Sequence, residues 1–418
     1  MGSSPTSSTP TRLESSERAA TVAARARLTR HELAGGLGDA GLFVPIAVAL
    51  VAVNGLNATA VFAVGGLAYL ATALLFRVPV PVQPLKAFAA AAIALELDAQ
   101  VIAAGALLMS AAMGLLAASG LAGWLAARFP LVLIRGIQAS VALLLCKAAV
   151  ELAQRGNWAG LPHVSEAVGI VTAAAACVAL FVLRDGRLPG TLVVLGGGAL
   201  AGVAVAGGLP DVTYGPQAIA VGAPEGAAFA TALTSLVIAQ LPLTFGNSVV
   251  AASDAERSYF GERAGRVTPD RLAASIGGAN LVAGLSGGLP LCHGAGGVTA
   301  HYKLGARTAA ATAGAGAIYL ALALAFGSSL PALLQLLMPG ALAGMLLYVA
   351  IQHALLAAQL ERLPDRVIAA GVGAVTIVSG NLAVGFAAGV AALVLRRART
   401  RVGEGTLRPH PAEGSAGS

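Results

Sequence analysis

The chain has 418 residues, of which 57% are hydrophobic and only 11% are charged. A soluble globular domain carries about a quarter charged residues, so the composition excludes that class and indicates a polytopic membrane protein. The net charge of +7 comes largely from arginines in tails and short loops, which is typical of membrane topology rather than of nucleic-acid binding. The three cysteines have no CxxC spacing, and no nucleotide-binding motif occurs, so we expect no disulfide framework, no metal site and no cofactor.

Residues 1–30 form a basic tail that we expect to be disordered and cytoplasmic. The first unit, 31–207, contains seven apolar segments bounded by turns or charges, and residues 208–225 form a polar linker. We predict its helices at 32–53, 58–76, 84–96, 99–119, 130–152, 163–183 and 188–207.

The second unit, 226–396, is predicted to contain helices at 226–246, 272–287, 293–303, 308–327 and 331–357. The apolar run 367–395 contains Gly380-Asn381 and could form one helix or two. Both tails are rich in arginine, which places both termini in the cytoplasm and requires an even number of spans. We therefore predict two helices there and fourteen spans in total, in a cell (inner or plasma) membrane. The tail 397–418 is too short for a further cytoplasmic domain.

Fourteen spans divide into seven plus seven, and an odd number in each half makes the halves inverted repeats. Landmarks recur at matching distances: Gly38-Asp39-Ala40 corresponds to Gly246-Asn247-Ser248, and Pro81 corresponds to Pro290 within one residue. Matched, interrupted segments in two inverted halves indicate the midplane site of a secondary transporter.

The two interrupted segments, 78–84 and 289–293, are predicted to be extended stretches that lead into half-helices, the third and the tenth. Unpaired backbone is tolerated inside a membrane only where protein or a polar cavity surrounds it. The N-terminus of each half-helix carries about half a positive charge and free amides. Two such ends, together with Lys86, predict an anion site near the membrane centre.

Three stretches resemble the molybdate transporter family, which is related to the SulP-type sulfate permeases. They are residues 38–45 (GDAGLFVP), 81–87 (PVQPLKA) and 290–297 (PLCHGAGG), the last continuing to YKLGART at 302–308. The stretch 240–247 (QLPLTFGN) supports the resemblance, which covers about 31–395.

The resemblance implies an all-α fold of seven-plus-seven inverted repeats with a core domain and a gate domain. It also implies import of a tetrahedral oxyanion, molybdate or sulfate, by symport with protons. We expect that two copies of the chain can pair as a homodimer. Two positions depart from the family pattern: Leu42 stands where threonine is frequent, and Lys303 stands where arginine is usual. We expect no cytoplasmic STAS domain of the kind that the sulfate permeases carry, and this expectation favours the molybdate branch.

The predicted substrate-binding residues lie at the two half-helix starts and on the eighth helix. They are Gln83, Pro84, Lys86, Ala87, Cys292, His293, Gly294, Ala295, Gln240, Thr244 and Asn247. Asp39 and His293 are the proton-coupling candidates, because a membrane acid and a histidine can both titrate. The alternatives are a structural hydrogen bond for Asp39 and a helix cap or an anion donor for His293.

Other functions remain open at this point. A transporter of the same fold could carry another anion or a nucleobase, and a passive anion channel would share the topology. An intramembrane enzyme built on Cys292 and His293 is disfavoured, because adjacent residues at a helix start point apart and no HExxH or GxSxG motif occurs. Molybdate and sulfate are both tetrahedral dianions, and the sequence does not distinguish them.

Overall fold

The computed structural model describes residues 28–154 except 123, 125–127 and 129, then 165–183 and 190–405. Most of the predicted tails, 1–30 and 397–418, therefore lies outside the described residues. In the first half the helices are α2 (Arg30–Gly36), α3 (Ala40–Asn54), α4 (Ala58–Phe76), α5 (Lys86–Ala94), α6 (Ala99–Ser119), α8 (Leu131–Gln154), α9 (Glu166–Leu183) and α10 (Gly190–Ala206).

The second half begins with helical turns that follow one another directly: α11 (Gly226–Ala232), a π-helical turn (Leu233–Val237), α12 (Ile238–Leu243), a second π-helical turn, η3 (Thr244–Val250), and α13 (Ala251–Phe260). It continues with α14 (Pro269–Ser286), α15 (Ala295–Lys303), α16 (Ala309–Phe326), α17 (Leu330–Gln335), α18 (Pro339–Ala357), α19 (Leu363–Ser379) and α20 (Leu382–Gly405). The described residues are thus almost entirely helical, as predicted.

Seven helices among the described residues are long and apolar enough to cross a membrane, and α2 and α3 together make an eighth if that bent pair is one span. The protein is therefore a multi-pass membrane protein. Several of the other predicted spans are shorter helices. Helices α5 and α15 have 9 residues each, and such a helix is about 14 Å long, roughly half the thickness of a bilayer core.

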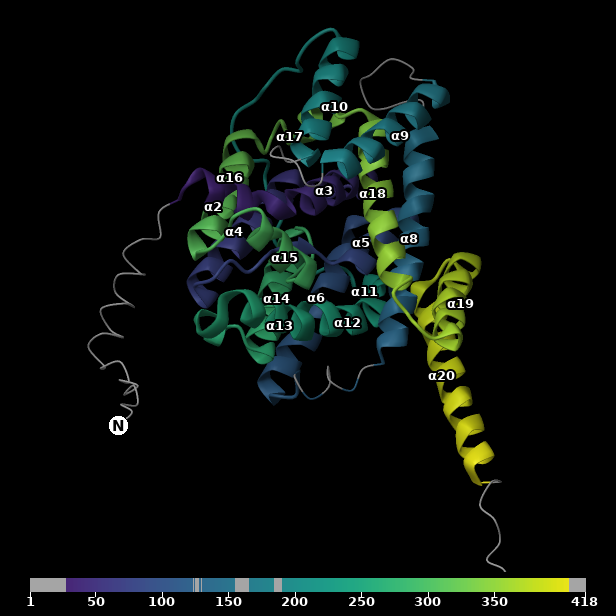
Figure 1. Ribbon diagram of the computed structural model, residues 1–418. Coiled ribbons are helices and arrows are strands. Elements are labelled where there is room, and N and C mark those ends of the chain that lie inside the picture. The colour runs from purple at the N-terminus through teal and green to yellow at the C-terminus, as the bar shows by residue number, and fades with distance from the viewer. Residues whose placement is uncertain are drawn as a thin grey trace, which may run out of the picture.

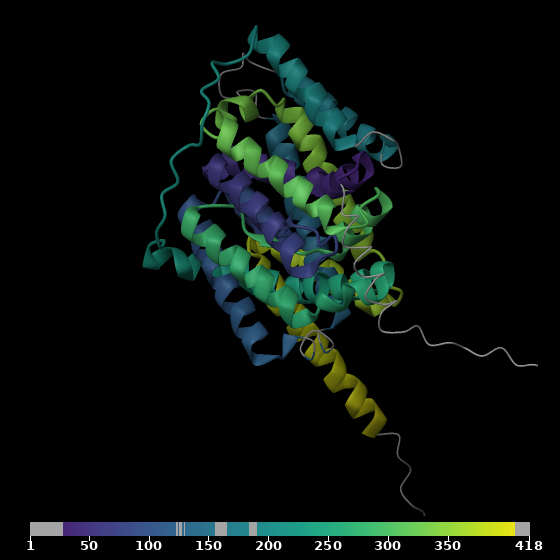
Figure 2. The same cartoon turned by 90° about the vertical axis from the view of Figure 1, so that its left-hand side faces the viewer.

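The long helices pack in two groups. In one group α6 packs along α14 and α4 along α16; in the other α8 packs against α18, α9 and α19, and α19 against α20 (Figure 1). Figure 2 shows α4, in blue-purple, beside α16, in green. Small residues permit this close packing: a Cβ atom on Gly66 of α4 would lie 2.8 Å from the carbonyl oxygen of Gly316 on α16.

Two short strands cross the middle of this bundle. Strand β1 (Gln83–Pro84) pairs antiparallel with β2 (Leu291–Cys292), with Gln83 opposite Cys292. The buried Asn280 side chain of α14 completes the pairing, since it donates to the Leu291 carbonyl (2.7 Å) and accepts from the Leu291 amide (3.1 Å). These bonds satisfy extended backbone that would be costly if left unpaired inside an apolar protein. The two predicted extended stretches are confirmed.

Three helix boundaries bear on the prediction. The segment 367–395 divides at Gly380, whose φ of 64° ends α19, as predicted. The predicted helix 331–357 is wrong as a single helix, because Pro339 starts α18; proline lacks an amide proton and suits a first helical turn. The predicted end at 246 is also wrong, since helical turns continue to Phe260, where Ala252 and Phe260 pack into an apolar cluster.

Candidate functional site

The strand pair brings the N-termini of α5 and α15 together. Helix α5 starts at Lys86 after an extended Leu85, and α15 starts at Ala295 after an extended Gly294. Neither capping residue provides a side-chain hydrogen bond to its own helix. Both helices therefore present backbone amides and the positive ends of their dipoles toward the strand pair, which is the arrangement that binds anions.

Three predicted residues meet at Gly294. A Cβ atom at this position would lie 2.2 Å from Gln83 Oε1, 3.0 Å from Lys86 Nζ and 3.1 Å from Asn247 Nδ2. The glycine thus leaves room for an amide oxygen, an ammonium group and an amide nitrogen beside the start of α15. Residues far apart in the sequence are assembled here around one small space.

A chain of side-chain hydrogen bonds joins Lys86 to Asp39. The Lys86 ammonium donates to Gln83 Oε1 at 2.8 Å, and Gln83 Nε2 donates to Asp39 Oδ1 at 2.6 Å. Asp39 and Gln83 are buried, whereas Lys86 is half-buried. Gln83 therefore lies between the cation and the carboxylate and is hydrogen-bonded to both.

Asp39 has a second neighbour that the sequence analysis missed. The Nε2 atom of His301, on the last turn of α15, lies 3.0 Å from Asp39 Oδ2, although the angles are not those of a hydrogen bond. The His301 ring is completely buried and stacks on Tyr69 of α4. The available signal was a second histidine eight residues after His293, in the short helix that follows it.

His293 and Cys292 hold the extended chain opposite them. His293 Nδ1 lies 2.7 Å from the Pro81 carbonyl oxygen, and its Nε2 lies 3.0 Å from Ser275 Oγ. The Cys292 thiol donates to the Pro84 carbonyl at 3.5 Å and is buried. Both side chains are thus engaged with neighbouring atoms of the protein, and the backbone after them forms the start of α15.

The eighth-helix candidates lie on or next to the second π-helical turn. Gln240 Oε1 accepts from the Phe88 amide in the first turn of α5 at 2.9 Å, and its Nε2 donates to Thr244 Oγ1 at 2.9 Å. Asn247 lies within that turn and points toward Gly294. Such π-helical turns are frequent at functional sites because they redirect side chains. Pro84 and Ala87, the remaining candidates, are buried beside Lys86.

The sequence analysis also did not select one buried polar residue of α18. His353 is 5% exposed, and its Nδ1 atom has no hydrogen-bond partner among the described residues. Leu346 of α18 and Ile93 of α5 line one small cavity. Leu346 lies seven residues before His353, and Ile93 lies seven residues after Lys86. The available signal was the histidine in a largely apolar helix.

Glu256 on α13 is a second buried polar group that sequence reasoning passed over. Its exposure is 0%, and neither carboxyl oxygen has a hydrogen-bond partner among the described residues. It lies one turn from both Ala252 and Phe260, which pack in an apolar cluster with Val298 of α15. Across all the residues that the structure describes, no three His, Cys, Asp or Glu side chains are grouped as a metal site would require.

The sequence matches the family described as "Molybdate transporter of MFS superfamily" over residues 31–145 and 232–352, more than half of the chain. The chain belongs to the molybdate transporter family. The matched segments of this molybdate transporter homologue include Asp39, Gln83 and Lys86 in the first and Asn247, His293 and His301 in the second.

Similar proteins extend the match over most of the chain. Molybdate transporter 2 of Arabidopsis thaliana is 28% identical and covers 88% of this chain and 88% of its own length. Molybdate transporter 1 of Chlamydomonas reinhardtii is 28% identical and covers 78% of this chain and 83% of its own length. The membership identifies a transporter rather than an enzyme.

Two solved structures share the fold at low sequence identity. The transmembrane domain of the cyanobacterial bicarbonate transporter BicA aligns with a TM-score of 0.60 and 17% identity, covering 86% of this chain and 97% of that one. Murine Slc26a9, an anion transporter in its inward-facing state, aligns with a TM-score of 0.63 and 15% identity, covering 95% and 74%. The molybdate transporter homologue therefore has the fold of SulP-type anion transporters.

Proposed function

We propose that this protein imports molybdate, a tetrahedral dianion, and that the anion binds between the N-termini of α5 and α15. The observation that carries the proposal is the meeting of Lys86 Nζ, Gln83 and Asn247 at Gly294. Two helix ends supply about one positive charge in total, and Lys86 supplies another. Together they would balance the charge of a dianion, and backbone amides with Asn247 would donate hydrogen bonds to its oxygens.

The coupling ion in this proposal is a proton that binds at Asp39. Its carboxylate lies between the amide of Gln83 and the ring of His301. Protonation would remove a negative charge two hydrogen-bonded steps from Lys86, and the site would then attract an anion more strongly. His293 is the second candidate, but both of its ring nitrogens already have polar neighbours. A second proton there would require the Ser275 hydroxyl to turn.

Movement follows alternating access in our proposal. The fourteen predicted spans form two inverted repeats of seven; α2–α6 and α11–α16 would move as a core domain against a gate of α8–α10 and α17–α20. In this proposal His353 of the gate, whose Nδ1 atom has no hydrogen-bond partner among the described residues, would contact the anion from the gate side. The arginine-rich tails favour cytoplasmic termini, and we place the protein in a cell membrane.

Uptake of radioactive molybdate into proteoliposomes tests the function. The wild-type protein should import molybdate faster when the outside is acidic, and an ionophore that dissipates the proton gradient should abolish that acceleration. Lys86→Ala should lower uptake at least tenfold, because a charge-assisted hydrogen bond is worth about 1.5–3 kcal/mol, while Lys147→Ala, a half-exposed lysine on α8, should not.

Competition separates the substrates. Unlabelled molybdate should compete best, with sulfate as the nearest rival and bicarbonate and uracil without effect. Preferential competition by bicarbonate or uracil would contradict molybdate as the substrate. Uptake that follows the membrane voltage, without any effect of pH, would instead identify a passive channel.

A further inference from the structure

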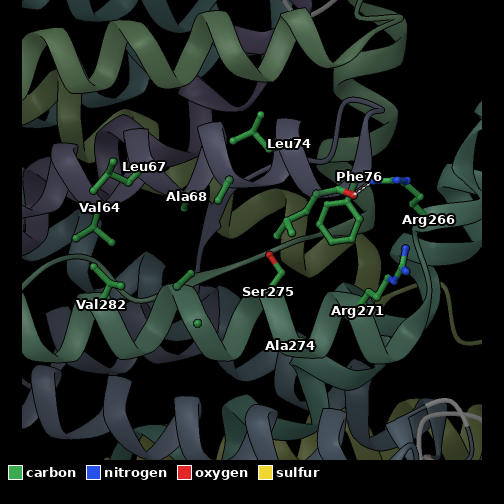
Figure 3. Close-up of a pocket in the computed structure, with 14 residues that line it drawn as sticks. Val64, Leu67, Ala68, Leu74, Phe76, Arg266, Arg271, Ala274, Ser275 and Val282 are labelled. Atoms are coloured by element: carbon green, nitrogen blue, oxygen red, sulfur yellow. Dashed lines mark hydrogen bonds between the residues drawn. The ribbon is translucent and has the colours of Figure 1, made fainter. Parts of the chain in front are cut away.

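A surface groove runs between α4 and α14, away from the site described above. Its volume is about 600 Å³, and its walls are almost entirely apolar. Figure 3 shows Val64, Leu67 and Val282 toward one end and Arg266 and Arg271 at the other. The groove therefore has an apolar body and a cationic head.

The body of the groove has the dimensions of one bilayer leaflet. Its lining residues on α4 extend from Val64 to Phe76, which corresponds to about 18 Å of helix. Half of a bilayer core is about 15 Å thick. Helix α4 is one of the apolar spans, and Leu74 on the groove is 77% exposed. The groove thus opens toward hydrocarbon, and an acyl chain matches its length and polarity.

The two arginines at its end are exposed and available to an anion. Arg266 reaches only the Leu75 carbonyl, at 3.4 Å, and among the described residues neither arginine forms an ion pair. Arg77 is also exposed, directly after α4. The acidic groups nearby in the sequence are Glu262, which is exposed, and Asp270, which is half-buried. The balance of charge at this end is positive.

We propose that the groove binds an anionic phospholipid, with one acyl chain along α4 and α14 and the phosphate at Arg266 and Arg271. Basic side chains at the membrane surface attract anionic lipids. Both termini are cytoplasmic in the proposed topology, and the two arginines follow the eighth predicted span, so the lipid would lie in the leaflet that faces the cytoplasm. The lipid site itself does not depend on which anion the protein transports.

The groove also touches the chain that builds the transport site. Ser275 lines the groove, and its hydroxyl lies 3.0 Å from His293 Nε2. The other ring nitrogen of His293 lies 2.7 Å from the Pro81 carbonyl, two residues before β1. A lipid in the groove therefore contacts a residue that positions the extended chain, so its occupancy should alter transport as well as stability.

Lipid binding to the purified full chain, in an uncharged detergent, tests the proposal. Phosphatidylglycerol and phosphatidylcholine with the same acyl chains are titrated separately, and bound lipid is counted by native mass spectrometry. Phosphatidylglycerol should bind at least tenfold more tightly. The double variant R266Q/R271Q should lose most of that preference, whereas R257Q/R263Q, which removes the same charge from two other exposed arginines, should keep it.

A second variant tests the apolar body. A side chain at Gly278 would meet open space on the groove side of α14, so Gly278→Trp should fill the groove and weaken binding of both lipids. Leu324→Trp, at an exposed position on α16, is the matched control and should bind like wild type.

Several results would overturn the lipid site. They are equal affinity for the two lipids, equal losses of lipid affinity in the two double-arginine variants, or complete replacement of the bound lipid by inorganic phosphate. A fourth is conversion of a dimer to a monomer by Gly278→Trp with lipid binding unchanged, because a second copy of the chain would then be the occupant. Molybdate uptake is measured on the same samples: its absence in wild type with lipid binding intact would contradict the proposed function alone.

Discussion

His301 Nε2 lies 3.0 Å from Asp39 Oδ2, although one residue belongs to the first half of the sequence and the other to the second half. The other oxygen of the same carboxylate accepts from Gln83, which in turn accepts from Lys86. A single buried carboxylate thus lies beside a histidine and is linked through Gln83 to a lysine at the proposed anion site. This relationship connects Asp39 with the starts of both α5 and α15.

Asp39→Asn should uncouple transport from protons. The amide cannot take up a proton, so the acceleration of molybdate uptake by external acid should disappear while binding of molybdate to purified protein persists. Asp254→Asn, on the exposed face of α13, is the control. If the Asp39 variant still responds to pH like wild type, the proton binds elsewhere, and His293 becomes the group to test.

Gly294→Ala should reduce molybdate binding at least tenfold. The added methyl group would lie 2.2 Å from Gln83 Oε1 and 3.0 Å from Lys86 Nζ, so both side chains would have to leave their positions. Gly296→Ala makes the same chemical change two residues later, where a Cβ atom meets open space, and it should bind molybdate like wild type. Equal affinities for the two variants would contradict the placement of the anion.

His353→Leu should raise the KM for molybdate about tenfold, because the ring would no longer donate a hydrogen bond from the gate side. His353→Gln, which keeps a donor, should recover much of the affinity. Leu355→Ala, at an exposed position on the same helix, controls for changes in α18. If the leucine and glutamine variants behave alike, the histidine has a packing role only.

Glu256→Leu should stabilise the protein in detergent. An apolar side chain of similar size would replace a carboxyl group that has no partner among the described residues, and burying such a group costs about 1–3 kcal/mol. The melting temperature should therefore rise by several degrees, whereas Glu262→Leu, at an exposed position, should leave it unchanged. A fall in the melting temperature of Glu256→Leu would reveal a stabilising contact of the carboxyl group.

The sequence by itself determined the class of the protein and the parts of its central site. Scarce charges and long apolar runs require a membrane protein, because the local composition of a segment decides whether it is stable in lipid or in water. Local rules also predicted the extended stretches, because Pro81 and Pro290 lack the amide hydrogen that a helix interior requires. The helix break at Gly380 has the same local origin, a residue free to adopt positive φ.

Only the tertiary structure decided which side chains meet. His301, His353 and Glu256 carry no local pattern that separates a functional polar residue from a structural one, and their meaning depends on partners far along the chain. The strand register likewise brings Gln83 opposite Cys292, which no local rule could predict. The physical reason is that backbone conformation depends on near neighbours, whereas the charge and hydrogen bonding of a buried side chain depend on whatever the folded chain places against it.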